Sequence, residues 1–217
     1  MSKSYKPVKK SFWAKLGKKQ KILCASCAAV LIAAIVLICV LCGGSGKTGS
    51  ASDCIAVIDI RDYGTVTVAL DADAAPETVA NFVSLAESGF YDGLTFHRIM
   101  NGFVMQGGDP KGNGTGGSAH TIKGEFAQNG VKNDISHVRG AISMARSSAY
   151  NSASSQFFIV QSDSTFLDGA YAAFGMVTDG MDVVDKVCAD ARPLDNNGTI
   201  AAKDQPVINS ITIRPAD

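Results

Sequence analysis

Three side chains within one short segment, residues 96–110 (FHRIMNGFVMQGGDP), could act together on a ligand. Arg98 is a permanent cation, Phe103 is an aromatic ring and Gln106 is a neutral amide. A glycine turn between them would place the three on two adjacent strands. None of them is a nucleophile or a general base, so the segment predicts recognition by hydrogen bonds and an apolar contact, without a covalent step. The alternative interpretation is that this segment is only an apolar strand, a glycine turn and a second strand, without a binding role.

A second polar and aromatic cluster, SSQFFIV at residues 154–160, has the same character and contributes Gln156 and Phe158. Like the first cluster, it contains no residue that suggests acid-base chemistry. Together the two clusters predict a site for a peptide-like ligand.

Two other patterns could suggest a dinucleotide or a metal site, but neither has the sequence context that such a site requires. GNGTGG at residues 112–117 fits G-x-G-x-x-G, but it follows no clear strand and opens no helix, so a dinucleotide site is not predicted. His97, His120 and His137 lie 23 and 17 residues apart without ligand partners at metal-binding spacing. We therefore expect no metal, and we interpret His97 as a structural neighbour of Arg98.

The elements around these clusters are mostly short strands. Residues 54–71 alternate apolar and polar side chains about a turn at Asp62–Gly64, which predicts a β-hairpin. Residues 75–89 and 180–189 have helical spacing. Many short strands with two isolated helices predict a mainly β fold, a closed antiparallel barrel capped by the two α-helices. Further strand-like runs are GAISMA, SQFFIVQ and PVINSITI.

Charge divides the 217-residue chain into two parts. Residues 1–52 carry nine lysines and no acid, whereas residues 53–217 hold 11 basic residues against 20 acidic ones, a net charge of −9. A domain this acidic is a poor binder of nucleic acid, which requires clustered positive charge.

The apolar run 22–42 has 21 residues without charge, Gly or Pro, the length of a transmembrane helix. Eight of the nine lysines precede it, so we predict a single-pass cell-membrane protein with a cytoplasmic tail at 1–21 and an extracytoplasmic domain. A cleaved signal peptide would have a shorter apolar run ending in small residues. A lipoprotein anchored at Cys42 is the remaining alternative. Residues 43–53 are a Gly/Ser-rich linker, and the domain at 54–217 follows.

Only Cys54 and Cys188 belong to that domain. Their separation in space cannot be read from the sequence, and we favour two unpaired cysteines over a disulfide.

The domain closely resembles the cyclophilin family. The resemblance covers essentially all of residues 54–217 and is carried by four blocks in the family's order and spacing: FHRIMNGFVMQGGDP, GNGTGG, SQFFIV and FLDGAYAAFGMVTDGMDVVDKV. It implies an eight-stranded barrel with two helices, cis-trans isomerisation of Xaa-Pro bonds and no cofactor.

The same resemblance implies roles for individual residues. Arg98 falls on the catalytic arginine, and Gln106 falls on the residue that fixes the substrate carbonyl and orients the arginine. The substrate contacts that it implies are Phe103, Val104, Gly114, Ala145, Arg146, Gln156, Phe158, Phe166, Leu167 and Tyr171.

Three positions depart from many eukaryotic members and look like the bacterial branch. Phe166 replaces a Trp that contacts cyclosporin, Tyr171 replaces a His, and Arg146 replaces an Asn. These departures put cyclosporin sensitivity and sequence preference in doubt more than activity.

The expected partners are proline-containing peptides and exported proteins during folding, bound by a monomer. Two rival interpretations use the same fold without catalysis: a peptide-binding chaperone module, and a structural envelope protein that docks one partner. The presence of Arg98 favours the enzyme.

Overall fold

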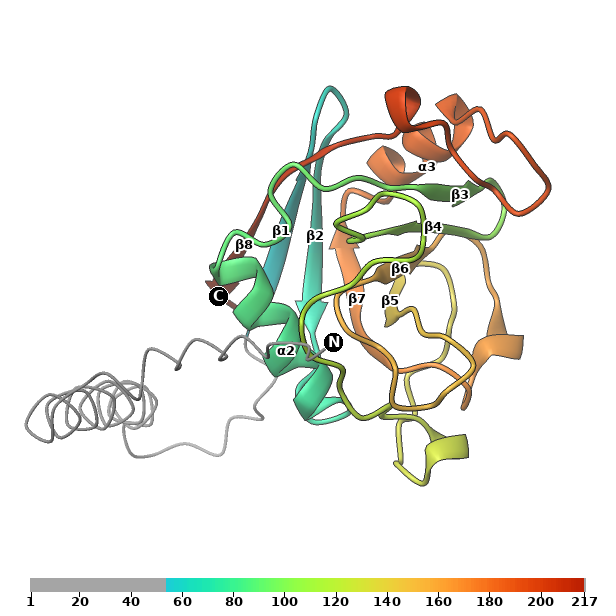
Figure 1. Ribbon diagram of the computed structural model, residues 1–217. Helices are drawn as coiled ribbons and strands as arrows, with labels where there is room; N and C mark the ends of the chain where they lie inside the picture. The colour runs from blue at the N-terminus through green and yellow to red at the C-terminus, as the bar shows by residue number, and fades with distance from the viewer. Residues whose placement is uncertain (1–53, 217) are drawn as a thin grey trace, which may run out of the picture. The chain divides into compact units, whose positions relative to one another are not determined.

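The structure, a computed structural model, describes residues 54–216 (Figure 1). The predicted tail at 1–21, membrane helix at 22–42 and linker at 43–53 lie outside these residues. Within 54–216, no helix has both the length and the apolar character needed to span a bilayer.

Eight strands form one antiparallel sheet with the order β3-β4-β6-β5-β7-β2-β1-β8. The sheet curls on itself, and the two helices lie against it (Figure 1). This confirms the mainly β class and the strand number. The strands are β1 (Cys54–Ile60), β2 (Gly64–Leu70), β3 (Arg98–Met100), β4 (Val104–Gly107), β5 (Ala141–Met144), β6 (Phe157–Val160), β7 (Ala173–Asp179) and β8 (Ile208–Pro215).

Closure of the curled sheet does not come from a strand ladder. No ladder joins the edge strands β3 and β8 in the described part of the chain. Instead, the segment before β3 bonds to the start of β8 and to the residues just before it. The Phe96 N–H donates to the Pro206 carbonyl at 2.9 Å, and the N–H of Ile208, the first residue of β8, donates to the Leu94 carbonyl at 2.8 Å. The predicted closure of the barrel is therefore corrected: strand pairing leaves an open edge between β3 and β8, which the chain before these strands bridges.

The predicted hairpin is formed by β1 and β2, paired from Cys54↔Leu70 to Ile60↔Gly64. Its turn contains Asp62 at φ 66°, a left-handed conformation that Asp tolerates better than most residues.

Both predicted helices are present, as α2 (Pro76–Glu87) and α3 (Met181–Asp190). Gly180 precedes α3 at φ 88°, and a Cβ there would collide with the Thr65 carbonyl oxygen. Glycine is therefore required at this helix start. Within residues 54–216, three single-turn 3-10 helices span Ala127–Asn129, Thr165–Leu167 and Ala202–Asp204.

The N-terminus of α2 is capped from a distant part of the chain. Its N-cap residue, Ala75, offers no side-chain hydrogen bond. The Glu125 carboxylate instead accepts from the Glu77 N–H at 3.0 Å and the Thr78 N–H at 2.7 Å. Glu125 is only 4% exposed, so its charge is stabilised by these donors and by the positive end of the helix.

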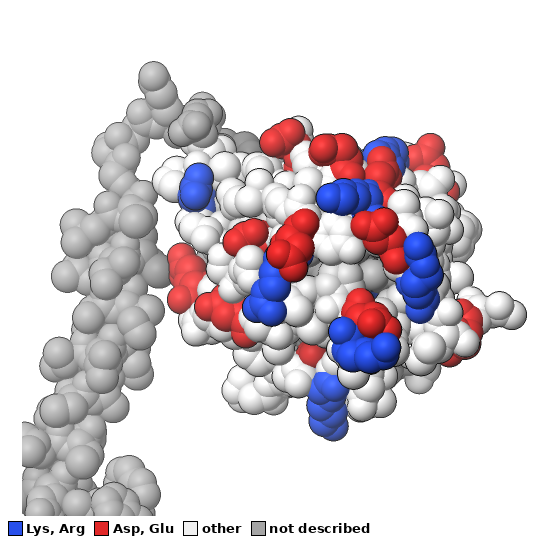
Figure 2. All heavy atoms as spheres, turned by 90° about the horizontal axis from the view of Figure 1, so that it is seen from above, with Lys and Arg blue, Asp and Glu red and all other residues white. Residues whose placement is uncertain are grey.

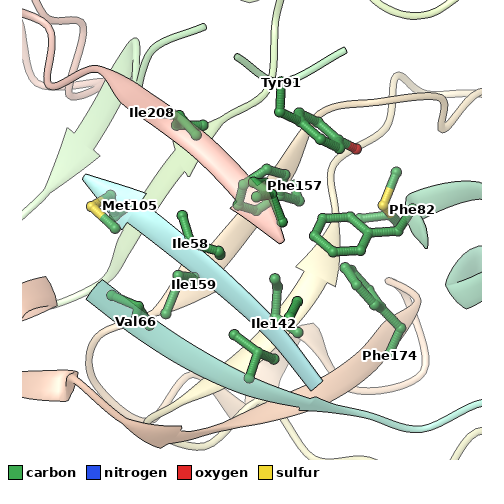
Figure 3. Packing of buried hydrophobic residues seen from close by; sticks show 14 of the residues in the cluster. Ile58, Val66, Phe82, Tyr91, Met105, Ile142, Phe157, Ile159, Phe174 and Ile208 are labelled. Carbon is green, nitrogen blue, oxygen red and sulfur yellow. The ribbon is translucent and has the colours of Figure 1, made fainter. Parts of the chain in front are cut away.

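The core holds a cluster of aromatic rings between α2 and the sheet (Figure 3). Phe82 of α2 is fully buried and lies 5.1 to 5.6 Å, centroid to centroid, from Tyr91, Phe157 and Phe174. The T-shaped contact between Phe82 and Phe157, at 90°, is a favoured aromatic geometry. These rings fix α2 against β6 and β7.

Cys54 and Cys188 carry free thiols, as predicted for two unpaired cysteines.

Figure 2 shows blue Lys and Arg side chains interspersed with red Asp and Glu on one face of the domain. That face therefore offers no continuous basic surface for nucleic acid.

Replacing the capping carboxylate should destabilise the domain. Glu125→Ala leaves the two N–H groups of α2 without an acceptor, so we expect the free energy of unfolding to fall by about 2 kcal/mol. Urea denaturation followed by circular dichroism measures this change. Glu87→Ala, at the exposed end of the same helix, is the matched control and should change stability little. Equal losses for the two variants would contradict the capping role of Glu125.

Candidate active site

The register of three neighbouring strands aligns polar and aromatic side chains in one row. Arg98 of β3 pairs with Gln106 of β4, and Gln106 pairs with Phe158 of β6. Residues directly opposite each other in an antiparallel sheet project from the same face. The two clusters predicted from separate segments therefore meet on one face of the sheet.

Alternation along β6 separates that face from the core. Phe157 and Ile159 point into the main core (Figure 3), whereas Phe158 and Val160 belong to a second, smaller apolar cluster with Val104. The second cluster forms the base of the candidate site. Partly buried residues packed against it are Phe103, Ala145, Leu167, Tyr171 and Met176.

The Arg98 guanidinium is held by three hydrogen bonds. Its Nε donates to the Asn197 carbonyl at 2.8 Å, its Nη1 donates to Gln106 Oε1 at 3.2 Å, and its Nη2 lies 3.0 Å from the Met100 sulfur. The guanidinium carbon is 5.9 Å from the centre of the Phe103 ring. Because a guanidinium has five N–H donors, one on each Nη remains for a ligand.

Burial lowers the pKa of Arg98, while the nearby Tyr171 and Asp195 raise it. Arginine starts so far above neutrality that the side chain remains a cation. It forms no ion pair with the residues that the structure describes. Its charge is therefore available to a ligand.

Gln106 connects Arg98 to the rest of the site. While its Oε1 accepts from Arg98, its Nε2 donates to Gln156 Oε1 at 2.9 Å, and Gln156 Nε2 donates to the Gly116 carbonyl at 2.7 Å. This chain of bonds sets the orientation of both amides. One N–H of the Gln106 amide remains for a ligand.

A pocket of about 430 Å³ lies beside Arg98, and we call it the apolar pocket because the second apolar cluster forms its base. Phe166, at its rim, is 74% exposed and stacks on Phe103 with ring centroids 5.6 Å apart. This apolar pocket brings together ten of the twelve predicted site residues: Arg98, Phe103, Val104, Gln106, Ala145, Arg146, Phe158, Phe166, Leu167 and Tyr171.

The other two predicted residues, Gly114 and Gln156, line an adjoining polar pocket of about 260 Å³. The polar pocket shares Gln106, Ala145 and Arg146 with the apolar pocket, so the two are continuous. The remaining residues that line it are Thr115, Gly116, Ser147, Ser152 and Ser154.

Behind the apolar pocket, His137 forms a hydrogen-bonded network. Its Nδ1 lies 2.8 Å from Asp168 Oδ1 and its Nε2 lies 3.0 Å from Ser143 Oγ. The set resembles a Ser-His-Asp triad, but Ser143 is fully buried and cannot reach a substrate. The imidazole instead stacks on Phe158, with centroids 6.0 Å apart and planes at 21°, so the network supports the base of the pocket.

Burial lowers the pKa of His137, although the hydrogen bond and charge of Asp168 raise it. Burial also lowers the pKa of His97, which is 4% exposed. Neither ring nitrogen of His97 has a hydrogen-bond partner among residues 54–216. His97 is thus a buried residue next to Arg98 in the chain, and we interpret it as a structural neighbour of that arginine.

Sequence reasoning missed several supporting residues. It did not predict the network of His137, Asp168 and Ser143, or the Asn197 carbonyl that holds Arg98. Asp168 offered a signal, because it directly follows Leu167, a predicted substrate contact. The GNGTGG segment did offer a signal, because its Gly114, Thr115 and Gly116 line the polar pocket.

The arrangement can bind an apolar ring and donate hydrogen bonds from a fixed cation and an amide. No accessible nucleophile or general base faces the apolar pocket, and no cluster of His, Cys, Asp and Glu among the described residues could hold a metal. The geometry therefore fits a reaction that needs only binding and electrostatic stabilisation.

Comparison with protein families gives one match over nearly the whole domain. The family described as "Cyclophilin type peptidyl-prolyl cis-trans isomerase/CLD" matches residues 55–214.

Similar curated proteins carry the same activity in their names. A peptidyl-prolyl cis-trans isomerase B of Bacillus subtilis is 47% identical over 123 residues, covering 57% of this chain and 82% of that protein. The isomerase B of Escherichia coli is 38% identical over 161 residues, covering 70% of this chain and 95% of that protein.

Among solved structures, a cyclophilin-type isomerase of Cryptosporidium parvum, crystallised in the presence of the dipeptide Ala-Pro, is similar with a TM-score of 0.65. It is 30% identical, and the match covers 74% of this chain and 98% of that one.

The two buried histidines should make stability depend on pH. Because burial lowers the pKa of His97 and His137 in the folded state, the unfolded chain binds protons below about pH 6.5 that the folded chain does not. Acidification favours the state that binds more protons, so the melting temperature should fall between pH 7 and pH 5.5. Calorimetry at half-unit pH steps measures this fall.

Variants assign the effect to these residues. His97→Gln and His137→Gln should each reduce the fall in melting temperature over this pH range, whatever their stability at pH 7. His120→Gln removes an exposed histidine and is the matched control. A control that flattens the profile as much as the other two would refute the assignment.

Proposed function

This chain belongs to the cyclophilin-type peptidyl-prolyl cis-trans isomerases, and we propose that it isomerises Xaa-Pro bonds in the apolar pocket beside Arg98. One observation carries this proposal: a guanidinium with two free N–H donors is fixed at the rim of a pocket that has room for a proline ring.

The reaction needs stabilisation of a twisted peptide bond. Rotation is slow because the nitrogen lone pair is delocalised into the carbonyl, which gives a barrier of about 18–20 kcal/mol. In the twisted state the lone pair localises on the prolyl nitrogen and can accept a hydrogen bond. Arg98 donates this bond from a free Nη–H. Because the planar ground state offers no such acceptor, the interaction lowers the barrier without tightening ground-state binding equally.

Gln106 contributes in two ways. Its Oε1 holds Arg98 in place, which keeps the donor oriented before the substrate arrives. Its free amide N–H binds the substrate carbonyl, so one side of the rotating bond is fixed. The ring of the substrate proline rests against Phe103, Phe158 and Leu167, and the chain on the other side of the bond turns.

The proposed setting is the outer side of the cell membrane, with the domain tethered by residues 22–42. The lysine-rich flank before this apolar run supports the orientation. Uncatalysed Xaa-Pro isomerisation takes tens to hundreds of seconds and can limit folding. An isomerase tethered there would act on exported proteins as they fold.

Replacing Arg98 tests the mechanism. Arg98→Ala should reduce kcat and kcat/KM by a similar factor, roughly a hundredfold, as for loss of one donor to a transition state. Arg98→Lys should also be slow, because an ammonium cannot hold Gln106 and address the prolyl nitrogen with the same planar fork. Exchange NMR on a short Xaa-Pro peptide measures both rates.

Arg192→Ala is the matched control, because Arg192 is exposed and bonds only to backbone carbonyls near the end of α3. It should leave turnover unchanged. The melting temperature of Arg98→Ala should stay within about 4 °C of wild type, equivalent to about 1 kcal/mol. Near wild-type turnover in Arg98→Ala would sink the proposed role.

Protease accessibility tests the membrane orientation. In intact cells stripped of any outer barrier, added protease should digest the domain at 54–217 and spare the lysine-rich tail at 1–21. Mass spectrometry of the mature protein should find residues 1–42 retained. A protected domain would reverse the orientation, and a product that begins at lipid-modified Cys42 would establish the lipoprotein instead.

A further inference from the structure

The charged residues that line the two pockets beside Gln106 are both arginines. Arg98 and Arg146 line the apolar pocket, Arg146 also lines the polar pocket, and no Asp or Glu lines either one. The surrounding domain is acidic, with 18 acidic and 11 basic residues between positions 54 and 216. The groove formed by the two pockets is therefore a local positive site on a negative domain.

Arg146 is held rigidly by groups that do not neutralise it. Its Nε donates to the Ala170 carbonyl at 3.0 Å and its Nη1 donates to the Ser147 carbonyl at 2.9 Å. Three aromatic rings surround its guanidinium carbon: Phe126 and Tyr150 at 5.1 Å and Tyr171 at 4.8 Å, measured to the ring centres. Such contacts orient a cation without cancelling its charge.

Arg139, by contrast, is an arginine whose charge is neutralised by a carboxylate in this domain. Arg139 forms a bidentate pair with Asp185, with N–O distances of 2.8 and 2.6 Å. Arg146 has no carboxylate within ion-pair distance among the described residues. Its Nη2 has no hydrogen-bond partner in that part of the chain either. The donors of Nη2 and the full charge are therefore available to a substrate.

We propose that Arg146 is a specificity-determining residue, which makes the enzyme prefer proline peptides with an acidic side chain next to the proline. This inference rests on the proposed assignment of the apolar pocket to the substrate proline. With the proline ring in that pocket, the neighbouring residue of an extended peptide lies about 3.5 Å along the chain. The polar pocket adjoins the apolar pocket, so a residue next to the proline can reach it, and Arg146 lines both pockets.

Charge alone sets the expected size of the effect. A partly exposed ion pair changes affinity by roughly threefold, and a like-charge contact weakens it by a similar factor. The kcat/KM of a Glu-Pro peptide should therefore exceed that of the matching Lys-Pro peptide by roughly tenfold at low salt. The difference should lie mainly in KM, since the charge is felt in the ground state as well as the transition state.

The experiment measures kcat/KM by exchange NMR for three peptides, Ala-Glu-Pro-Phe, Ala-Gln-Pro-Phe and Ala-Lys-Pro-Phe, and reports the Glu-to-Lys ratio for each variant. Arg146→Gln should lower the ratio to roughly threefold, the part that Arg98 still supplies. Arg146→Lys should keep a higher ratio than Arg146→Gln, because it retains the charge. In 0.5 M salt the wild-type ratio should fall toward one.

Arg192→Gln is the matched control: it removes the same charge from an arginine that also bonds to backbone carbonyls, outside the groove. It should leave the ratio at the wild-type value. The proposal is overturned by a wild-type ratio near one, by equal ratios in Arg146→Gln and wild type, by equal losses in Arg146→Gln and Arg146→Lys, or by an equal loss in the control.

Arg98→Ala separates this inference from the proposed function. If that variant keeps turnover on all three peptides, the proposed catalytic role of Arg98 is wrong. If it loses turnover while Arg146→Gln leaves the ratio unchanged, the catalytic role stands and only the acidic preference is wrong.

Discussion

The site depends on the register of β3, β4 and β6. Arg98, Gln106 and Phe158 lie in one row because each is directly opposite the next in an antiparallel ladder. A slip of one residue would turn Arg98 toward the core and place an apolar side chain in the groove, because side chains alternate between faces. Burial of Ile99 and Met105 on the opposite face makes such a slip costly. Packing of the core on one face of the sheet therefore fixes the position of the Arg98 guanidinium on the other face.

Adjacent residues of β6 connect stability to function. Phe157 packs on the aromatic core, and the next residue, Phe158, forms the base of the apolar pocket against His137. A rigid pocket floor is useful to an enzyme that acts only through shape and electrostatics, because the hydrogen-bond donor must be in position before the peptide bond twists. The hydrogen bonds of His137 to Asp168 and Ser143 add rigidity without taking part in chemistry.

The groove and the rest of the domain differ in charge. The domain as a whole is acidic, yet its groove holds Arg98 and Arg146 without a carboxylate to pair with either. Both guanidiniums are fixed by carbonyls, amides and aromatic rings, which are neutral partners. Neutral partners leave the guanidinium charge free to act on a substrate. An ion pair such as that of Arg139 with Asp185 would neutralise it.

Local sequence patterns determined the hairpin at 54–71 and both helices, because alternation, helical spacing and turn residues act over a few positions. They also singled out five site residues, and the family resemblance supplied the other seven. Family resemblance supplied the roles of Arg98 and Gln106, and the structure places all twelve predicted residues in two joined pockets. Only the tertiary structure decided that Glu125 caps α2 from 47 and 48 residues away, that the chain before β3 and β8 bridges the edge between them, and that Arg146 lacks a carboxylate. Such contacts join residues far apart in the chain, and no local spacing encodes which distant groups will meet when the core closes.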